Sequence, residues 1–141
     1  LYSMPNSGLN NYPEPDGSEF VFAHYSEDPG DHRFGWGIQS KPDNHGSGYQ
    51  IRFRAGNGRY ELARDASELD TSNKTPPTGE YIIAKVTWSS NGDISVIIED
   101  VDGNELTTLQ ATDTTYQSKG GVFIAGRGTS SGGKAIYDGI V

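Results

Sequence analysis

Apolar and polar residues alternate along most of this chain with a period of two, which is the pattern of strands that bury one face. In segment 33–39 the aromatic and aliphatic residues share one parity, whereas arginine, glycine and glutamine share the other. Segment 48–55 repeats the pattern, with Tyr49, Ile51 and Phe53 opposite a glutamine and two arginines. The alternation predicts a two-layer β-sandwich with apolar inner faces and polar outer faces.

Turn-forming residues separate these segments at roughly the 8–12-residue spacing of all-β sandwiches. Helical periodicity is limited to one short turn at 66–69, and the polar stretch 70–79 is expected to be a surface crossover. Asn-Gly or Asp-Gly pairs at 57–58, 91–92 and 102–103 predict hairpins. The predicted strands are 19–25, 33–39, 48–55, 59–64, 80–88, 93–99, 105–111 and a closing pair, 120–126 and 134–141.

The composition suits a strand-and-turn domain of an acidic, exposed protein. A length of 141 residues fits one domain, residues 1–141, and the 19 glycines suit tight reversals. Two Trp, eight Tyr and five Phe argue against disorder. A net charge of −8 argues against nucleic acid or an anionic membrane as partner. Scarce lysine favours salt adaptation, with an ordinary acidic extracellular domain as the alternative.

Several observations point to an extracellular location or a cell or virion surface. The chain has no cysteine and no apolar run of the ~20 residues that span a bilayer, so we expect no membrane insertion. It begins without methionine or a basic region, which is expected of a mature or excised segment of a longer protein. Residues 1–11 form an irregular lead-in, and Asn73 begins an N-glycosylation sequon.

Seven motifs, spread over roughly residues 9–141, carry a family resemblance. They are Tyr12–Gly17, Phe20–Phe22, His32–Gly37, Gly48–Arg52, Arg59–Leu62, Asp113–Tyr116 and the closing strands, of which the last carries Asp138. With these motifs the chain resembles laminin G-like modules of the concanavalin A-like lectin and glucanase superfamily. The resemblance implies an all-β, two-sheet antiparallel jelly-roll sandwich, and a non-catalytic carbohydrate-recognition or adhesion module of a longer extracellular protein.

One departure from the family concerns the N-terminus. In such domains the last strand usually pairs with an N-terminal strand, but the residues before Tyr12 have a poor strand pattern. We therefore expect that this strand is missing, or that another segment or a neighbouring chain supplies or covers the edge.

The predicted outer face of two strands carries an arginine- and glutamine-rich set of candidate ligand-binding residues. Guanidinium forks pair with carboxylates and sulfates, so an acidic polysaccharide is the predicted glycan. The alternative is that these arginines pair with the many acidic side chains of the chain itself. Tyr60 and Trp88 lie beside turns and are candidates for partly exposed stacking on sugar rings. The set comprises Arg33, Gln39, Gln50, Arg52 and Arg54.

A structural calcium ion is the candidate cofactor. The resemblance implies that Asp138 is a metal ligand, with Glu14, Asp16 or an acid upstream of the chain completing the oxygen set. A second acidic loop, Asp-x-Asp-x-Asn at 100–104, resembles part of a calcium loop, but it is equally a simple hairpin turn.

Catalytic motifs are weak, so two further functions stand behind glycan recognition. Glu68 and Asp70 begin the paired-carboxylate pattern of fold-related glucanases, but position 73 is asparagine. A lyase set would use Gln39, Arg52 and Tyr60 with a histidine, yet none of the three histidines (His24, His32 and His45) matches those strands. The alternatives are a structural sandwich domain packed in a larger assembly and, behind it, a glycan-cleaving enzyme.

Overall fold

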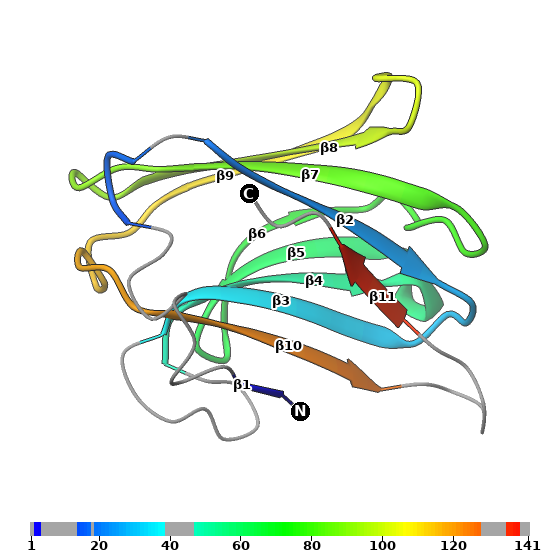
Figure 1. Cartoon of the computed structure of the whole chain (residues 1–141), viewed down its shortest axis with the longest axis horizontal. Helices are drawn as coiled ribbons and strands as arrows, with labels where there is room; N and C mark the ends of the chain where they lie inside the picture. Colours follow the sequence, from blue (N-terminus) through cyan, green and yellow to red (C-terminus); the bar gives the residue numbers. More distant parts are fainter. Residues whose placement is uncertain (1, 4–13, 18, 39–46, 128–134, 139–141) are drawn as a thin grey trace.

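The computed structural model describes residues 2–3, 14–17, 19–38, 47–127 and 135–138, in which strands form two antiparallel sheets (Figure 1). Sheet A has the order β1 (Tyr2–Ser3), β10 (Gly121–Arg127), β3 (Asp31–Ile38), β4 (Tyr49–Arg54), β5 (Arg59–Arg64) and β6 (Ser67–Ser72). Sheet B has the order β11 (Ala135–Asp138), β2 (Phe20–Ser26), β7 (Tyr81–Trp88), β8 (Asp93–Asp100) and β9 (Glu105–Thr112).

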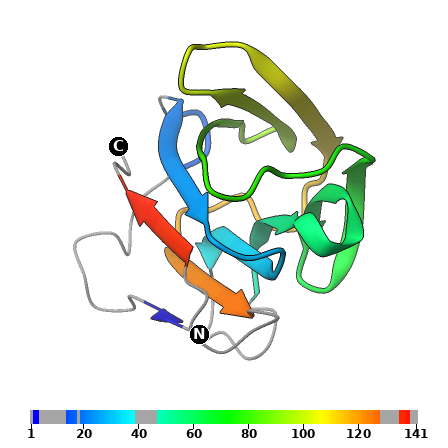
Figure 2. The same cartoon turned by 90° about the vertical axis from the view of Figure 1, so that its right-hand side faces the viewer.

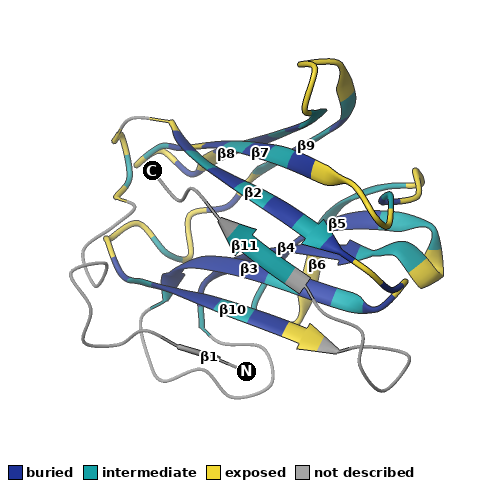
Figure 3. Ribbon diagram, turned by 45° about the vertical axis from the view of Figure 1, so that its right-hand side comes forward, coloured by how far each residue is buried: buried dark blue, intermediate teal, exposed yellow. Residues whose placement is uncertain are grey.

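The sheets stack as two layers around an aromatic core, so the predicted sandwich is confirmed (Figures 1 and 2). Phe22 of sheet B stacks on Phe34 of sheet A with ring centroids 3.9 Å apart, and Trp36 meets Phe20 edge-on at 5.7 Å. Burial follows the alternation, as Figure 3 shows along the inner faces. The apolar parity read from the sequence is therefore the parity that packs between the layers.

Three hairpins form where the turn residues predict them. β4 leads into β5 through the 3₁₀ turn η2 (Ala55–Asn57), and Gly58 follows with φ 68°. This turn is longer than the two-residue reversal that Asn-Gly suggests. β7–β8 and β8–β9 are the other two pairs, and Gly92 and Gly103 take positive φ in their turns. Glycine is favoured at these positions because a side chain strains the left-handed backbone.

Two predictions about strands are wrong. Residues 67–72 were expected to be a turn and crossover, but they form β6 at an edge of sheet A, where both faces tolerate polar residues. The closing strands were expected to pair with each other, but β10 lies in sheet A beside β3, whereas β11 lies in sheet B beside β2. The lead-in also contains a short strand, β1, which pairs with β10.

The packing of β3 against β10 depends on Gly35. A Cβ atom at this position would lie 1.9 Å from Cε1 of the Phe123 ring, which is buried on the same face. We expect Gly35→Ala to lower the free energy of unfolding by about 2 kcal/mol, because the ring must leave its position. Urea unfolding measures this. Gly121→Ala is the glycine control, because the nearest neighbour of a Cβ atom there would be Cβ of Ile38, 4.0 Å away, and an equal loss in both variants would contradict the packing explanation.

No helix in the described ranges is long and apolar enough to cross a bilayer.

Candidate functional site

Strand register brings a set of charged side chains together on the outer face of sheet A. Arg33 of β3 lies opposite Arg52 of β4, which lies opposite Glu61 of β5. In the adjacent row, Asp31 of β3 lies opposite Arg54 of β4, which lies opposite Arg59 of β5. We call these six residues the arginine cluster: Asp31, Arg33, Arg52, Arg54, Arg59 and Glu61.

Glu61 is the anchor of the arginine cluster. One carboxylate oxygen, Oε2, accepts a hydrogen bond from Arg52 at 3.2 Å. The other, Oε1, accepts one from Arg54 at 2.9 Å and lies 2.6 Å from a terminal nitrogen of Arg59. Three guanidinium groups thus converge on one carboxylate that is 1% exposed.

Asp31 is the second carboxylate of the cluster. It receives a two-pronged contact from Arg33, with Nε at 3.3 Å from Oδ1 and a terminal nitrogen at 2.7 Å from Oδ2. Nε of Arg54 lies 3.8 Å from the same Oδ2. Arg54 therefore joins the two carboxylates, and the cluster is one connected network.

Two guanidinium groups of the cluster are more exposed than both of its carboxylates. The side chains of Arg54 and Arg59 are 25% and 34% exposed, whereas Glu61 is almost fully covered. Four guanidinium groups face two carboxylates, which leaves an excess of two positive charges within the cluster. The accessible part of this surface is therefore cationic on a chain whose net charge is −8.

The pKa values of the cluster reflect burial and pairing. Burial raises the pKa of Glu61, but hydrogen bonds from Arg54 and Arg52 and the nearby guanidinium charges outweigh it, so the net shift is downward. Burial lowers the pKa of Arg52, and its hydrogen bond to Glu61 acts in the opposite direction. Glu61 therefore stays ionised in the folded chain and holds the arginines through charge as well as geometry.

On the rest of the outer face of sheet A, the side chains around Gln50 and Phe123 are buried and not accessible to a ligand. Gln50 Oε1 accepts a hydrogen bond from Nε of Arg52 at 3.1 Å. A terminal nitrogen of Arg52 also donates to the carbonyl of Asp65 at 3.1 Å, and the Gln50 amide donates to the same carbonyl. Gln50 and Arg52 share the face that the sequence predicts, but they are buried in this network. Arg33, Arg54 and Arg59 are the accessible members.

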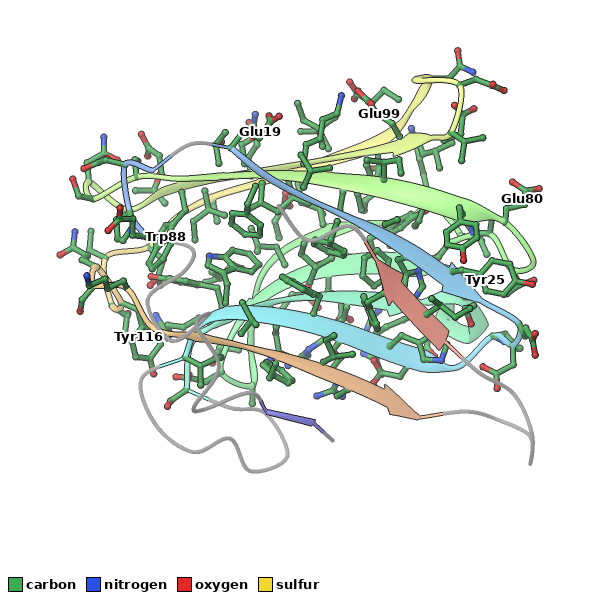
Figure 4. The ribbon with its side chains drawn as sticks, in the orientation of Figure 1. Glu19, Tyr25, Glu80, Trp88, Glu99 and Tyr116 are labelled. Atoms are coloured by element: carbon green, nitrogen blue, oxygen red, sulfur yellow. The ribbon has the colours of Figure 1, made fainter. Side chains whose placement is uncertain are left out.

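The expectation that Tyr60 and Trp88 are partly exposed is wrong. Tyr60 is 1% exposed and Trp88 is 4% exposed, because both side chains point between the sheets. Trp88 packs edge-on against Tyr49 at 5.8 Å, and Figure 4 places it at one end of the molecule beside Tyr116. Neither ring is available for stacking on a sugar at the sheet surface.

Sequence reasoning missed three members of the cluster. Arg59 has the outward parity of β5 and lies opposite Arg54, and both facts were readable from the hairpin around residues 56–58. Asp31 and Glu61 also share this parity, but their pairing depends on which strands are neighbours. Gln39 lies outside the described residues.

The calcium predictions remain untested. The backbone of Asp138 pairs with Ala23, and its side chain lies outside the description. Asp16 accepts a hydrogen bond from the amide of Ser90 at 2.8 Å, and Asp100 accepts bonds from the amides of Asp102 and Asn104. In the described ranges, no group of three or more His, Asp or Glu side chains is arranged to hold a metal ion.

The carboxylates considered for catalysis lie on β6. Glu68 is exposed, and Asp70 accepts hydrogen bonds from the amides of Thr71 and Gln110 at 2.9 and 2.8 Å. Asp70 is thus engaged in joining the edge of β6 to the edge of β9. His24 and His32 are buried between the sheets, and His45 lies outside the described residues.

Comparison with solved structures finds this sandwich architecture in other proteins. The carbohydrate-binding module CBM66 from Bacillus subtilis matches with a TM-score of 0.61 and 13% identity, covering 88% of this chain and 74% of that one. Galectin-1-L2 from Danio rerio matches with a TM-score of 0.60 and 12% identity, covering 94% and 96%. The fold is a jelly-roll sandwich of the concanavalin A-like type.

A third solved structure, a Shewanella oneidensis protein of unknown function, matches with a TM-score of 0.50 and 15% identity over 87% of this chain and 55% of that one. No protein-family model and no curated protein sequence matches the chain. The laminin G-like assignment therefore stays a prediction, and identities this low show the fold alone.

Proposed function

We propose that this chain is a non-catalytic carbohydrate-recognition or adhesion module of an extracellular or surface protein, and that it binds an acidic glycan through the arginine cluster. The observation that carries the proposal is the pair Arg54 and Arg59, whose side chains are 25% and 34% exposed above the buried carboxylate of Glu61. The lectin-type fold supports a glycan as the class of ligand.

The geometry of the cluster favours an anionic ligand. Because Glu61 and Asp31 fix the guanidinium groups in place, little side-chain freedom is lost when a ligand binds. Guanidinium groups that protrude beyond their carboxylate partners can each donate further hydrogen bonds to a sulfate or carboxylate. The excess of two positive charges would attract such a group, whereas the rest of this acidic chain repels it.

A glycan array tests this function on the isolated chain, at low and multimolar salt, with calcium and with chelator. We expect selective binding to sulfated or carboxylated glycans, weakened by salt. Arg54→Ala is expected to lower the affinity about tenfold, because it removes one accessible cation without unpairing a fully buried one. Lys85→Ala, which breaks an ion pair with Glu99 on the outer face of sheet B, is the control for loss of a positive charge.

Arg52 is unsuitable for this test, because its side chain is buried against Glu61 and Gln50. Removing it would take one of three cationic partners from the buried carboxylate of Glu61, so it would lower the stability of the fold as well as the binding. A folded protein that binds no glycan on the array, or one whose binding is equally strong in Arg54→Ala, would contradict the proposal. Loss of glycan binding in the presence of chelator would show that binding also requires calcium.

The edge of β11 favours a second candidate function, a structural domain packed in a larger assembly. β11 pairs with β2 along one edge, and no described strand pairs with its other edge. At the opposite side of the sandwich, hydrogen bonds from β9 to Asp70 and Ser72 of β6 close the gap between the sheets. A neighbouring chain that adds a strand to β11 would be detected as an assembly by light scattering.

A further inference from the structure

The outer face of sheet B is partly apolar, unlike the charged outer face of sheet A. An antiparallel sheet with one solvated face usually carries polar side chains on that face. Here, apolar side chains of outward parity are neighbours across β11, β2, β7 and β8, and all of them are half-buried or exposed. We call these six residues the tyrosine patch: Val21, Tyr25, Tyr81, Ile83, Ile97 and Ile136.

Two aromatic rings lie side by side in the tyrosine patch. Tyr25 of β2 lies directly opposite Tyr81 of β7, and their ring centroids are 5.0 Å apart. Tyr81 is 40% exposed, and Ile136 of β11 lies opposite Tyr25 on its other side. Tyrosine is enriched at protein interfaces because it combines a large apolar area with a polar end. A surface on which apolar residues are contiguous, rather than scattered singly, is typical of an interaction site.

Acidic side chains border the patch. Glu99 of β8 lies opposite Ile83 and, on its other side, opposite Glu105 of β9. The hydrogen bond from Lys85 to Glu99 and the charges of Glu99 and Glu19 raise the pKa of Lys85, so Glu19 is close enough to act on it. Figure 4 shows Glu19 and Glu99 on the outer side of sheet B, the upper layer in this view. Three carboxylates therefore face one ammonium group, which leaves an excess of two negative charges.

These charges select the sign of a partner. Glu99 and Glu105 lie directly opposite each other, and like charges in this position repel, so a cation from outside would stabilise both. An anionic ligand would be repelled here, in contrast to the arginine cluster. The tyrosine patch thus favours a ligand that combines apolar groups with positive charge.

We propose that the tyrosine patch docks a basic segment of a partner protein. Apolar side chains of the segment cover the patch, and its lysine or arginine side chains pair with Glu19, Glu99 and Glu105. A guanidinium group can also lie over a tyrosine ring. A neutral sugar fits less well, because small-molecule sites are concave with converging polar groups, whereas four of the six members of the patch are aliphatic. The inference does not depend on the proposed function, because the arginine cluster lies on the opposite face of the sandwich.

Amide NMR titration of the whole chain with an octapeptide of alternating leucine and lysine tests this surface. We expect saturable shifts confined to residues 19–25, 81–85, 97–99 and 105. The matched octapeptide of alternating leucine and glutamate carries the opposite charge and should give none. Equal shifts with both peptides, no shifts with the basic one, or shifts confined to other surfaces would overturn the proposal.

Variants of the patch test which side chains make the contact. Tyr81→Ser should weaken the binding of the basic peptide about tenfold, because it removes an exposed aromatic contact. Ile83→Thr keeps a β-branched residue in the strand and should weaken it about fivefold, which secures the test if Tyr81→Ser does not fold. Val101→Ser is the matched control, because Val101 is 66% exposed in the turn between β8 and β9, outside the patch. Unchanged binding in the folded patch variants would refute the proposal.

Charge variants distinguish the local carboxylates from the net charge of −8. Glu105→Gln should weaken peptide binding about threefold, whereas Glu68→Gln, the same change on the exposed edge of sheet A, should have no effect. Equal weakening in both would mean that net charge alone attracts the peptide, against the proposal. Patch shifts with methyl glycosides of glucose or galactose, but none with the basic peptide, would assign the patch to a sugar instead. Arg54→Ala, which tests the proposed function, should leave peptide binding intact.

Discussion

Replacing Glu61 with glutamine is expected to lower the free energy of unfolding by about 3 kcal/mol. The carboxylate is 1% exposed and pairs with Arg52, Arg54 and Arg59. An amide can accept hydrogen bonds but carries no charge, so three guanidinium groups would remain close together without their counter-ion. Arg52 is the costliest of the three, because it is itself buried, whereas solvent screens the other two.

Urea unfolding at neutral pH measures this loss. Glu80→Gln is the matched control, since it makes the same chemical change on an exposed residue and should alter stability by less than about 0.5 kcal/mol. An equally small effect of Glu61→Gln would mean that the arginines are not held by this carboxylate. The cationic surface would then lose its structural basis.

Stability is expected to fall steadily as the pH drops below about 6.5, because two histidines are buried uncharged between the sheets. The ring of His24 stacks on Phe53 at 4.1 Å, and its Nε2 has no hydrogen-bond partner among the described residues. Burial and the charge of His32 lower the pKa of His24 from 6.5 to about 3. Burial also lowers the pKa of His32, although Asp28, 3.5 Å away, opposes the shift.

The sign follows from where protons bind. Below pH 6.5 the unfolded chain takes up a proton on His24 that the folded chain does not accept until the pH falls to about 3. Unfolding therefore becomes easier by about 1.4 kcal/mol per pH unit from His24 alone. The stability is fully present above pH 6.5 and is lost between these two pKa values. His32 acts in the same direction, because burial lowers its pKa too.

The variant His24→Phe isolates this contribution. Phenylalanine keeps a planar ring against Phe53 but cannot take up a proton. At about pH 5 the variant should exceed the wild-type chain in stability by about 2 kcal/mol more than it does at about pH 8. Chemical unfolding at both pH values measures the difference. Parallel pH profiles for the two proteins would show that His24 does not remain uncharged in the folded state.

The fold followed from the sequence because strand alternation is a local property. Phe34, Trp36, Ile51 and Phe53 are buried on the parity that the pattern indicates, since one row of each strand must face the other layer. β6 was missed because it is a polar edge strand with only Leu69 packed against the core. The placement of β10 and β11 in different sheets depends on long-range pairing, which local pattern does not encode.

The sequence predicted only part of the arginine cluster, because strand alternation is local and the pairing of strands is not. Parity placed Arg33, Arg52 and Arg54 on one face, but the pairing of all three with carboxylates depends on the register of β3, β4 and β5. Position beside a turn suggested exposure for Trp88, whereas the inward parity that it shares with Val86 buries it. Exposure of a strand-end side chain is set by how far the opposite layer extends, and this information comes only from the assembled sandwich.

Amide NMR with a sulfated oligosaccharide tests most directly whether the arginine cluster is a glycan-binding surface. The expected result is a set of saturable shifts confined to residues 31–33, 52–54 and 59–61, which need about tenfold more ligand in Arg54→Ala while the spectrum stays that of a folded protein. Absence of shifts in a folded sample, or shifts confined to β11 and the outer face of sheet B, would contradict recognition by the cluster. The second of these results would favour the assembly edge as the functional surface.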